Sequence, residues 1–317
     1  MKKILSFFIL GVTFFIFLPN VASYALEPVI AVVSIKSVNP YNQAFSGFEQ
    51  ELKDSGVKKF LYQFDLGSFE DNQGELVNKI NILKPNLIFA IGTKATLFAQ
   101  ENFKEVPIIS SMVLSPVKSG VSGNPEGLGD STVEVSLDIP LEVQFKKLKE
   151  VLPSVKRVGV LYNAKDYEWI KRVAMVGRKY GLAIVAKPVN AGTDVPRLLD
   201  EIVKEVDCLW AQADNLIYNV QSSEYIILTL IRNKLPFMAF SSSYVKAGAL
   251  FALECDYVNI GRQSAILAIR ILKGADPKLI ASVEPKKVML VVNQRIAQLI
   301  GINIPLEIMN QAKEVYQ

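Results

Sequence analysis

The sequence contains no histidine in its 317 residues, and this absence excludes several classes of function. Histidine is the usual general base near neutral pH and the commonest metal ligand in proteins. Its absence excludes Ser-His-Asp and Cys-His nucleophile arrangements and histidine-ligated zinc sites. A hydrolase that uses Asp or Ser remains the enzymatic alternative, but no serine lies in a nucleophile elbow. We therefore expect a protein that is not an enzyme and that needs no metal or cofactor.

Cysteine and net charge are also scarce. The two cysteines, Cys208 and Cys255, lie in apolar strand-like runs, and a further strand is expected between them at residues 236–240. They could pair in an oxidising compartment, but the intervening strand favours two buried free thiols. Residues 1–25 carry two Lys and no acid, so the formal net charge falls from +4 to +2 without them. Such a small charge does not indicate a nucleic-acid or membrane-surface partner.

Long hydrophobic runs are absent except at the N-terminus. Lys2 and Lys3 precede an apolar run at residues 4–18, and the small residues Ser23 and Ala25 follow it. This pattern predicts a secretory signal peptide over residues 1–25 and therefore a periplasmic protein. An uncleaved membrane anchor is the alternative, but the run is shorter than the roughly 20 residues that a bilayer requires.

After this segment, strand and helix patterns alternate. The continuous apolar run at residues 29–35 is typical of a strand covered on both faces of a parallel sheet. A helix with Asn39 as N-cap and Pro40 in its first turn follows it. Further strands are expected at residues 59–66, 86–91 and 106–113. A helix marked by Leu76, Ile80 and Leu83 is expected between the first two of them, and another with Thr93 as N-cap between the last two. Four strands separated by helices indicate one parallel α/β lobe.

The alternation restarts after a Gly- and Pro-rich loop at residues 115–132. About 290 residues exceed one small core, so two domains are expected. The fold class is therefore α/β, with two doubly wound parallel-sheet lobes joined by a multi-strand hinge. The chain is expected to cross between lobes near residues 138, 256 and 290. Lobe 1 would comprise residues 26–138 plus about 256–290, and lobe 2 residues 139–255 plus about 291–317.

Ligands of open α/β sheets bind beyond the carboxyl ends of the strands. In this sequence those ends carry hydroxyls, amides and acids, without a matched acid/base pair. Asp214 could meet a ligand amine, and Tyr41, Tyr162 and Tyr244 could wall an apolar or aromatic group. Capping alone would also explain Asn39 and Thr93, and a plain turn would explain the serines at 241–243.

Several segments resemble bacterial ABC-transporter substrate-binding proteins of the tryptophan/tyrosine-binding-like group, which have the type I periplasmic-binding fold. The most specific of them is residues 246–274 (KAGALFALECDYVNIGRQSAILAIRILKG), and others are residues 33–47, 88–93, 158–163, 211–215 and 291–305. The resemblance implies a small ligand held between the lobes and passed to a membrane permease that a cytoplasmic ATPase drives. It also implies these pocket residues: Asn39, Thr93, Ser111, Asn163, Asp214, Asn215, Ser242 and Asp256.

The chain departs from this family at two places near the expected cleft. Many relatives have His-Pro where this chain has Asn39-Pro40, and many have Thr-Asp-Pro where it has Leu114-Ser115-Pro116. The resemblance therefore implies an amino-acid-like or aromatic ligand without naming it. We expect a monomer that captures this ligand by hinge closure for an ABC permease. A module that presents the ligand to a membrane receptor kinase is the alternative.

Overall fold

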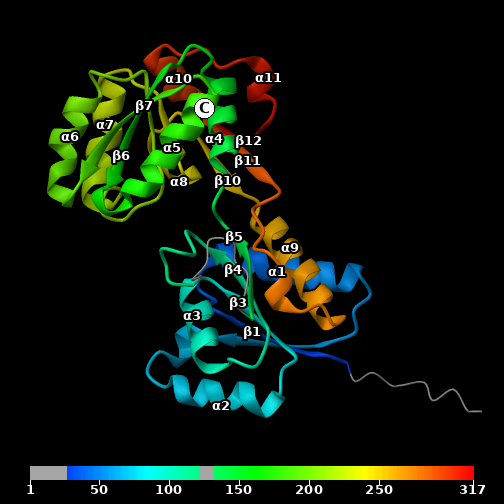
Figure 1. Ribbon diagram of the computed structural model, residues 1–317. Helices are drawn as coiled ribbons and strands as arrows, with labels where there is room; N and C mark the ends of the chain where they lie inside the picture. Colours follow the sequence, from blue (N-terminus) through cyan, green and yellow to red (C-terminus); the bar gives the residue numbers. More distant parts are fainter. Residues whose placement is uncertain (1–26, 122–130) are drawn as a thin grey trace, which may run out of the picture.

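The structure is a computed structural model that describes residues 27–121 and 131–317. The expected signal peptide at residues 1–25 and the centre of the expected loop at 115–132 lie outside the described residues. The chain forms two α/β lobes, each built on its own sheet, and narrow connecting segments join them (Figure 1). The expected fold class is confirmed.

Lobe 1 contains a five-stranded parallel sheet in the order β2-β1-β3-β4-β5. Its central strands are buried almost along their whole length because helices cover both faces of the sheet. All five residues of β3 are buried, for example. The strands are β1 (Val29–Ser34), β2 (Phe60–Asp65), β3 (Leu87–Ile91), β4 (Ile108–Val113) and β5 (Thr132–Ser136).

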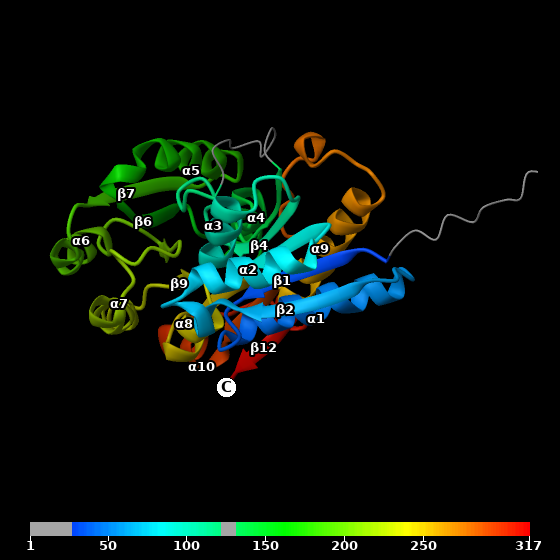
Figure 2. The same ribbon diagram turned by 90° about the horizontal axis from the view of Figure 1, so that it is seen from below.

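Helices on the two faces of this sheet close two apolar cores. One face packs against α1 (Asn39–Asp54) and α9 (Tyr257–Leu272), and the other against α2 (Gln73–Leu83) and α3 (Thr93–Asn102). α9 comes from much later in the chain, yet it lies beside α1 in both views (Figures 1 and 2). Short 3₁₀ turns complete the lobe at η1 (Leu66–Phe69) and η4 (Pro277–Leu279).

Lobe 2 contains a seven-stranded sheet in the order β12-β11-β10-β9-β8-β6-β7. Its neighbouring strands are parallel except β10 and β11, which are antiparallel because β11 enters from the opposite lobe. The strands are β6 (Arg157–Asn163), β7 (Ala183–Val189), β8 (Cys208–Trp210), β9 (Phe237–Ala239), β10 (Phe251–Cys255), β11 (Val288–Asn293) and β12 (Ala312–Tyr316). Cys208 and Cys255 are free and buried, and β9 separates their strands as expected.

Two apolar cores again lie on the two faces of the sheet in lobe 2. The helices around them are α4 (Leu141–Val151), α5 (Tyr167–Lys179), α6 (Val195–Ile202), α7 (Val220–Arg232), α8 (Ser242–Ala247), α10 (Gln294–Ile300) and α11 (Leu306–Met309), with 3₁₀ turns η2 (Ala164–Asp166) and η3 (Gly192–Asp194). Within the residues that the structure describes, no helix has the length and apolarity needed to cross a membrane.

Three segments connect the lobes, as the sequence predicts. Residues 137–140 lead from β5 to α4, Asp256 joins β10 to α9, and residues 280–287 lead from η4 to β11. Hydrogen bonds tie these segments together. The Cys255 thiol donates to the Leu137 carbonyl (3.4 Å), and the Asp256 N–H donates to the Lys287 carbonyl (3.1 Å). The exact residue boundaries of the two lobes stay a prediction.

Some sequence-based expectations about element ends are wrong. Val38 and Gly92, not Asn39 and Thr93, are the N-caps of α1 and α3, because their carbonyls accept the first helical hydrogen bonds. In lobe 2, α7 begins at Val220, several residues after the strand-end residues Asp214 and Asn215. Its start is set by the side chain of Asn219, which accepts hydrogen bonds from the backbone N–H groups of Gln221 and Ser222.

Candidate functional site

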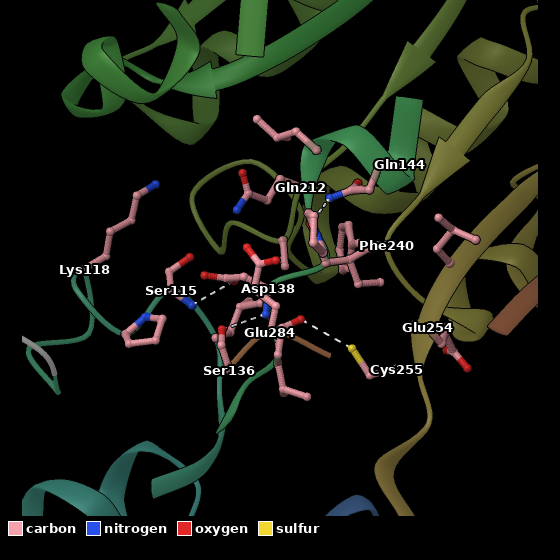
Figure 3. A pocket seen from close by; sticks show the side chains of 18 of the residues that line it. Ser115, Lys118, Ser136, Asp138, Gln144, Gln212, Phe240, Glu254, Cys255 and Glu284 are labelled. Atoms are coloured by element: carbon pink, nitrogen blue, oxygen red, sulfur yellow. Dashed lines mark hydrogen bonds between the residues drawn. The ribbon is translucent and has the colours of Figure 1, made fainter. Parts of the chain in front are cut away.

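A cavity of about 970 Å³ lies between the two lobes, beside the connecting segments. Its wall comes from the β4–β5 loop and β5 in lobe 1, from α4, α5 and the ends of β8 to β10 in lobe 2, and from all three connections. Figure 3 shows side chains converging from both lobes, with Asp138 near the centre, Lys118 on one side, and Phe240 and Gln144 on another. The volume is at the upper end of the range for small-molecule pockets.

The lobe 1 wall depends on a distorted strand end. The pairing of β4 with β5 shifts register between Ser111 and Val113, and Met112 there has a positive φ of 59°. Ser115 also has a positive φ, 48°, and its N–H donates to Oδ1 of Asp138 at 3.0 Å. Two non-glycine residues in the left-handed region are costly, so this loop is held by its surroundings. Asp138 fixes the loop that forms one side of the cavity.

The connection that carries Asp138 is itself firmly bonded. The backbone N–H of Asp138 donates to Oγ of Ser136 at 2.9 Å (Figure 3). The side-chain amide of Gln144 donates to the carbonyl of Ile139 at 2.7 Å and accepts from the indole N–H of Trp210 at 2.9 Å. Both the N–H and the oxygen of the Gln144 amide are therefore hydrogen-bonded, and they link the connection to lobe 2.

Aromatic side chains form the apolar part of the wall. Trp169 and Phe240 line the cavity from α5 and from the end of β9. Trp169 is stacked on the buried Trp210, with ring centroids 5.8 Å apart. Phe240 packs against Tyr244 and Tyr218, with centroids 4.7 and 5.5 Å away. Both rings are thus backed by further aromatic rings and present fixed apolar faces to a ligand.

Carboxyl groups form the acidic part of the wall. Glu134 on β5 is only 4% exposed, and its Oε1 has no hydrogen-bond partner among the described residues. Burial, helped by the charge of Asp138, raises the pKa of Glu134 to about 8. Burial also raises the pKa of Asp138, although the Ser115 N–H and the charge of Lys118 oppose that change. This pair is the most perturbed group of acids on the cavity wall.

One ion pair spans the two lobes at the cavity. Nζ of Lys118, from the β4–β5 loop, lies 2.6 Å from Oδ2 of Asp166 in η2. The same ammonium lies 5.3 Å from the ring centroid of Trp169, which is within cation–π distance. Arg172 supplies the second positive charge on the wall. The cavity therefore combines acids, bases and aromatic faces.

The eight residues predicted to bind the ligand do not line this cavity. Asn39 and Thr93 are the first residues of α1 and α3. Ser111 is fully buried, and its Oγ accepts a hydrogen bond from Ser264 of α9 at 3.2 Å. Ser111 lies near the carboxyl end of β4, and Asn39 and Thr93 begin the helices that follow β1 and β3.

The other five lie at strand ends of lobe 2 or at a connection. Side-chain oxygens of Asn163 and Asp214 accept from backbone N–H groups two residues ahead, at 3.2 and 2.8 Å. Asn215 is exposed, and the N–H of Ser242 donates to a carboxylate oxygen of Glu254. Asp256 is the N-cap of α9 and pairs with Lys287 at 2.8 Å. Ligand contact by any of the eight stays a prediction.

The three tyrosines expected to contact the ligand do not line this cavity and pack against other parts of the protein. Tyr41 packs over Gly92, where a Cβ would lie 2.4 Å from the phenol oxygen. Tyr162 is buried in a lobe 2 core, and the Tyr244 hydroxyl is 2.6 Å from that of Ser223. Gly92 adopts a φ of 93°, so glycine is required there both by the backbone and by the tyrosine ring.

Sequence reasoning placed Leu114-Ser115-Pro116 near the cleft, and these residues line the cavity, but it missed most of the wall, namely Glu134, Asp138, Gln144, Trp169, Gln212 and Phe240. One signal was available for Glu134, because it is an acid within the apolar, β-branched strand Thr132–Ser136. Gln212 lies two residues after β8 and lines the cavity. No cluster of three or more metal-ligating side chains occurs among the described residues.

Comparisons with known proteins agree with the two-lobed architecture. The sequence model of the family described as ABC transporter substrate binding protein matches residues 29–316. A curated tyrosine-binding protein of Clostridioides difficile (strain R20291) is 27% identical over 241 residues, which are 74% of this chain and 69% of that protein.

Solved structures match over nearly the whole chain. The ligand-free, open structure of a substrate binding protein with adhesive properties from Clostridium difficile has a TM-score of 0.77 at 22% identity, covering 92% of this chain and 99% of that one. The ABC domain in complex with L-Trp from Streptococcus pneumonia has a TM-score of 0.62 at 21% identity, covering 91% and 99%. These likenesses support the fold.

Proposed function

Because this chain belongs to the family of ABC transporter substrate-binding proteins, we propose that it captures a small molecule outside the cytoplasm and delivers it to an ABC permease. The observation that carries this proposal is the cavity of about 970 Å³ between two lobes joined by three connecting segments. A pocket that lies between two bodies can open for entry and close around the ligand.

The proposed ligand is amino-acid-like or aromatic. The cavity wall supports this choice because it offers flat apolar faces at Trp169 and Phe240 together with charges of both signs. A zwitterion with an apolar side chain needs all three features. The tyrosine-binding protein of Clostridioides difficile supports the same class of ligand.

The proposal includes binding without chemical turnover. The sequence has no histidine, and the cavity wall holds no nucleophile hydrogen-bonded to a base among the described residues. The N-terminal pattern of residues 1–25 supports export to the periplasm, where a monomer would meet the permease. A kinase gene beside this one, in place of permease and ATPase genes, would favour the sensing alternative.

A thermal-shift screen tests the proposal. The protein is unfolded, dialysed and refolded to remove any copurified ligand, and then melted with amino acids, nucleosides, sugars and small carboxylates. A ligand at one hundred times its dissociation constant stabilises the folded state by about 2.7 kcal/mol, which is a clear shift in melting temperature. We expect aromatic amino acids to give the largest shift. A uniform absence of shifts across all classes would contradict the proposed function.

A further inference from the structure

Glu134 is an unusual group to find in a strand interior. Its neighbours in β5, Val133 and Val135, pack in the core against α1 and α9. Strand side chains alternate between faces, so Glu134 and Ser136 face the other way, and both line the cavity. Glu134 is therefore a carboxyl that is 4% exposed, directed toward the cavity, and without a partner for Oε1 among the described residues.

Burying a carboxyl without a hydrogen-bond partner destabilises the folded protein. No nearby group among the described residues offsets this loss of stability with an ion pair. Neither Glu134 nor Asp138 forms an ion pair within the part of the chain that the structure describes. Lys118, which is on the same wall, is instead 2.6 Å from Asp166. Two neighbouring carboxyls that form no ion pair with a protein cation favour a positively charged group supplied from outside.

We propose that the Glu134–Asp138 end of the cavity is the subsite for a protonated amine of the ligand, and that Glu134 loses its proton when the ammonium binds. This inference rests on the proposed function of the cavity. It differs from the sequence-based expectation that Asp214 meets the amine. Asp214 lies off the cavity wall, and its Oδ1 already accepts the Leu216 N–H at 2.8 Å.

The binding step balances as a proton exchange. The O–H bond of the Glu134 carboxyl breaks, and its proton passes to water and then to the buffer. The carboxylate that remains forms a charge-assisted hydrogen bond with the ligand's –NH₃⁺ group. A neutral acid and a cation thus become an ion pair and one released proton, with no oxidant or other reactant required.

Other charged or titratable groups lie near this subsite on the neighbouring elements and on the cavity wall. β4 has none, and η4 contributes Lys278 on its exposed surface. On the cavity wall they are Lys118, Arg172, Glu254, Cys255, Tyr257 and Glu284. Burial raises the pKa values of Cys255 and Tyr257 to about 12, so both are neutral near pH 7. Glu134 titrates near neutral pH, because its pKa is about 8.

The direction of the pH effect follows from this value. Without ligand, Glu134 is mostly protonated at pH 7, and an adjacent ammonium lowers its pKa. Binding of an amine therefore releases close to one proton at pH 7, and affinity rises as the pH increases toward about 8. A ligand without an amine releases none.

Isothermal titration calorimetry in buffers of different ionisation enthalpy measures the released protons. The probes are L-tyrosine, L-tryptophan, tyramine and 3-(4-hydroxyphenyl)propionate, which has the ring and carboxylate of tyrosine but no amine. We expect proton release at pH 7 with the probes that carry an amine, and none with the propionate. Glu134→Gln should abolish the release and weaken amine binding about ten- to a hundredfold, while affinity for the propionate stays unchanged.

Glu105→Gln is the matched control, since Glu105 is an exposed acid of lobe 1 outside the cavity. It should leave affinity and proton release unchanged. Amine binding without proton release in the unmodified protein would overturn the inference, whether or not the variant folds. Binding of the propionate alone, or of none of these probes, would also overturn it. Either result leaves the proposed function standing if another class of ligand stabilises the protein in the thermal-shift screen.

Discussion

Glu134 links the stability of the folded protein to pH at the scale of one residue. Its pKa is about 8 in the folded state and about 4.3 in an unfolded chain, so the folded state holds the extra proton between these values. The contribution of this group to stability therefore falls as the pH rises from about 4.3 to 8 and stays low above 8.

Glu134→Gln should remove this penalty because the amide keeps the shape of the neutral acid and cannot ionise. We expect the variant to be more stable than the parent at pH 9 by roughly 2 to 4 kcal/mol in the free energy of unfolding. At pH 4 the two proteins should be equally stable. Urea unfolding at both pH values checks this, and the same difference at pH 4 and pH 9 would contradict it.

Single residues were also the hardest features to predict from the sequence. Polar side chains at strand ends were recognised in the sequence, but their hydrogen-bond partners were not predicted. Ser111 occurs at a strand end as expected, yet it shares the face of β4 with Ile109, so its hydroxyl lies in the core and accepts from Ser264. Asn39 and Thr93 each fall one residue inside their helices. Hydrogen-bond partners depend on tertiary contacts, which composition and periodicity do not contain.

At the scale of elements, α1 and α9 pack with their backbones in contact at two glycines. A Cβ on Gly261 of α9 would lie 1.8 Å from the carbonyl oxygen of Ala44 in α1. A Cβ on Gly47 of α1 would lie 2.0 Å from the carbonyl oxygen of Val258 in α9. Both contacts are with backbone atoms, which cannot move aside as a flexible side chain can. The two glycines thus set the distance between the helices.

Gly261→Ala should therefore destabilise the protein by about 2 kcal/mol or more, because the helices must separate to admit the methyl group. Gly74→Ala in α2 is the matched control, since the nearest atom to its Cβ is 4.0 Å away. That change should be neutral or slightly stabilising, because alanine favours helix. Chemical unfolding of both variants measures the difference, and equal effects at the two glycines would refute the close packing.

Most elements were predictable because their periodicity is strong. The buried strands β1 and β3 read as continuous apolar runs, and α1 shows apolar residues at helical spacing. Short elements near the C-terminus were not predicted, notably α8, α11 and β12. β12 has an exposed centre, so its sequence lacks a clear strand pattern, and it is a strand because β11 offers it a parallel partner.

At the scale of the whole molecule, the two lobes and their three connections were predictable. The alternation of strand and helix restarts in the middle of the chain, and the tail is too short for a third domain. The family resemblance implied a cavity between the lobes, but most of the residues of its wall were not predictable. The wall depends on how the lobes face one another and on the loop that Asp138 holds in place. No pattern within a single lobe contains that information.

The central claim is that the two lobes close on a small ligand about their connecting segments. Small-angle X-ray scattering of the refolded protein, alone and saturated with L-tyrosine or L-tryptophan, tests this claim most directly. Closure brings the lobes together, so the account predicts a smaller radius of gyration in the saturated protein. An unchanged radius of gyration at demonstrated saturation would contradict it.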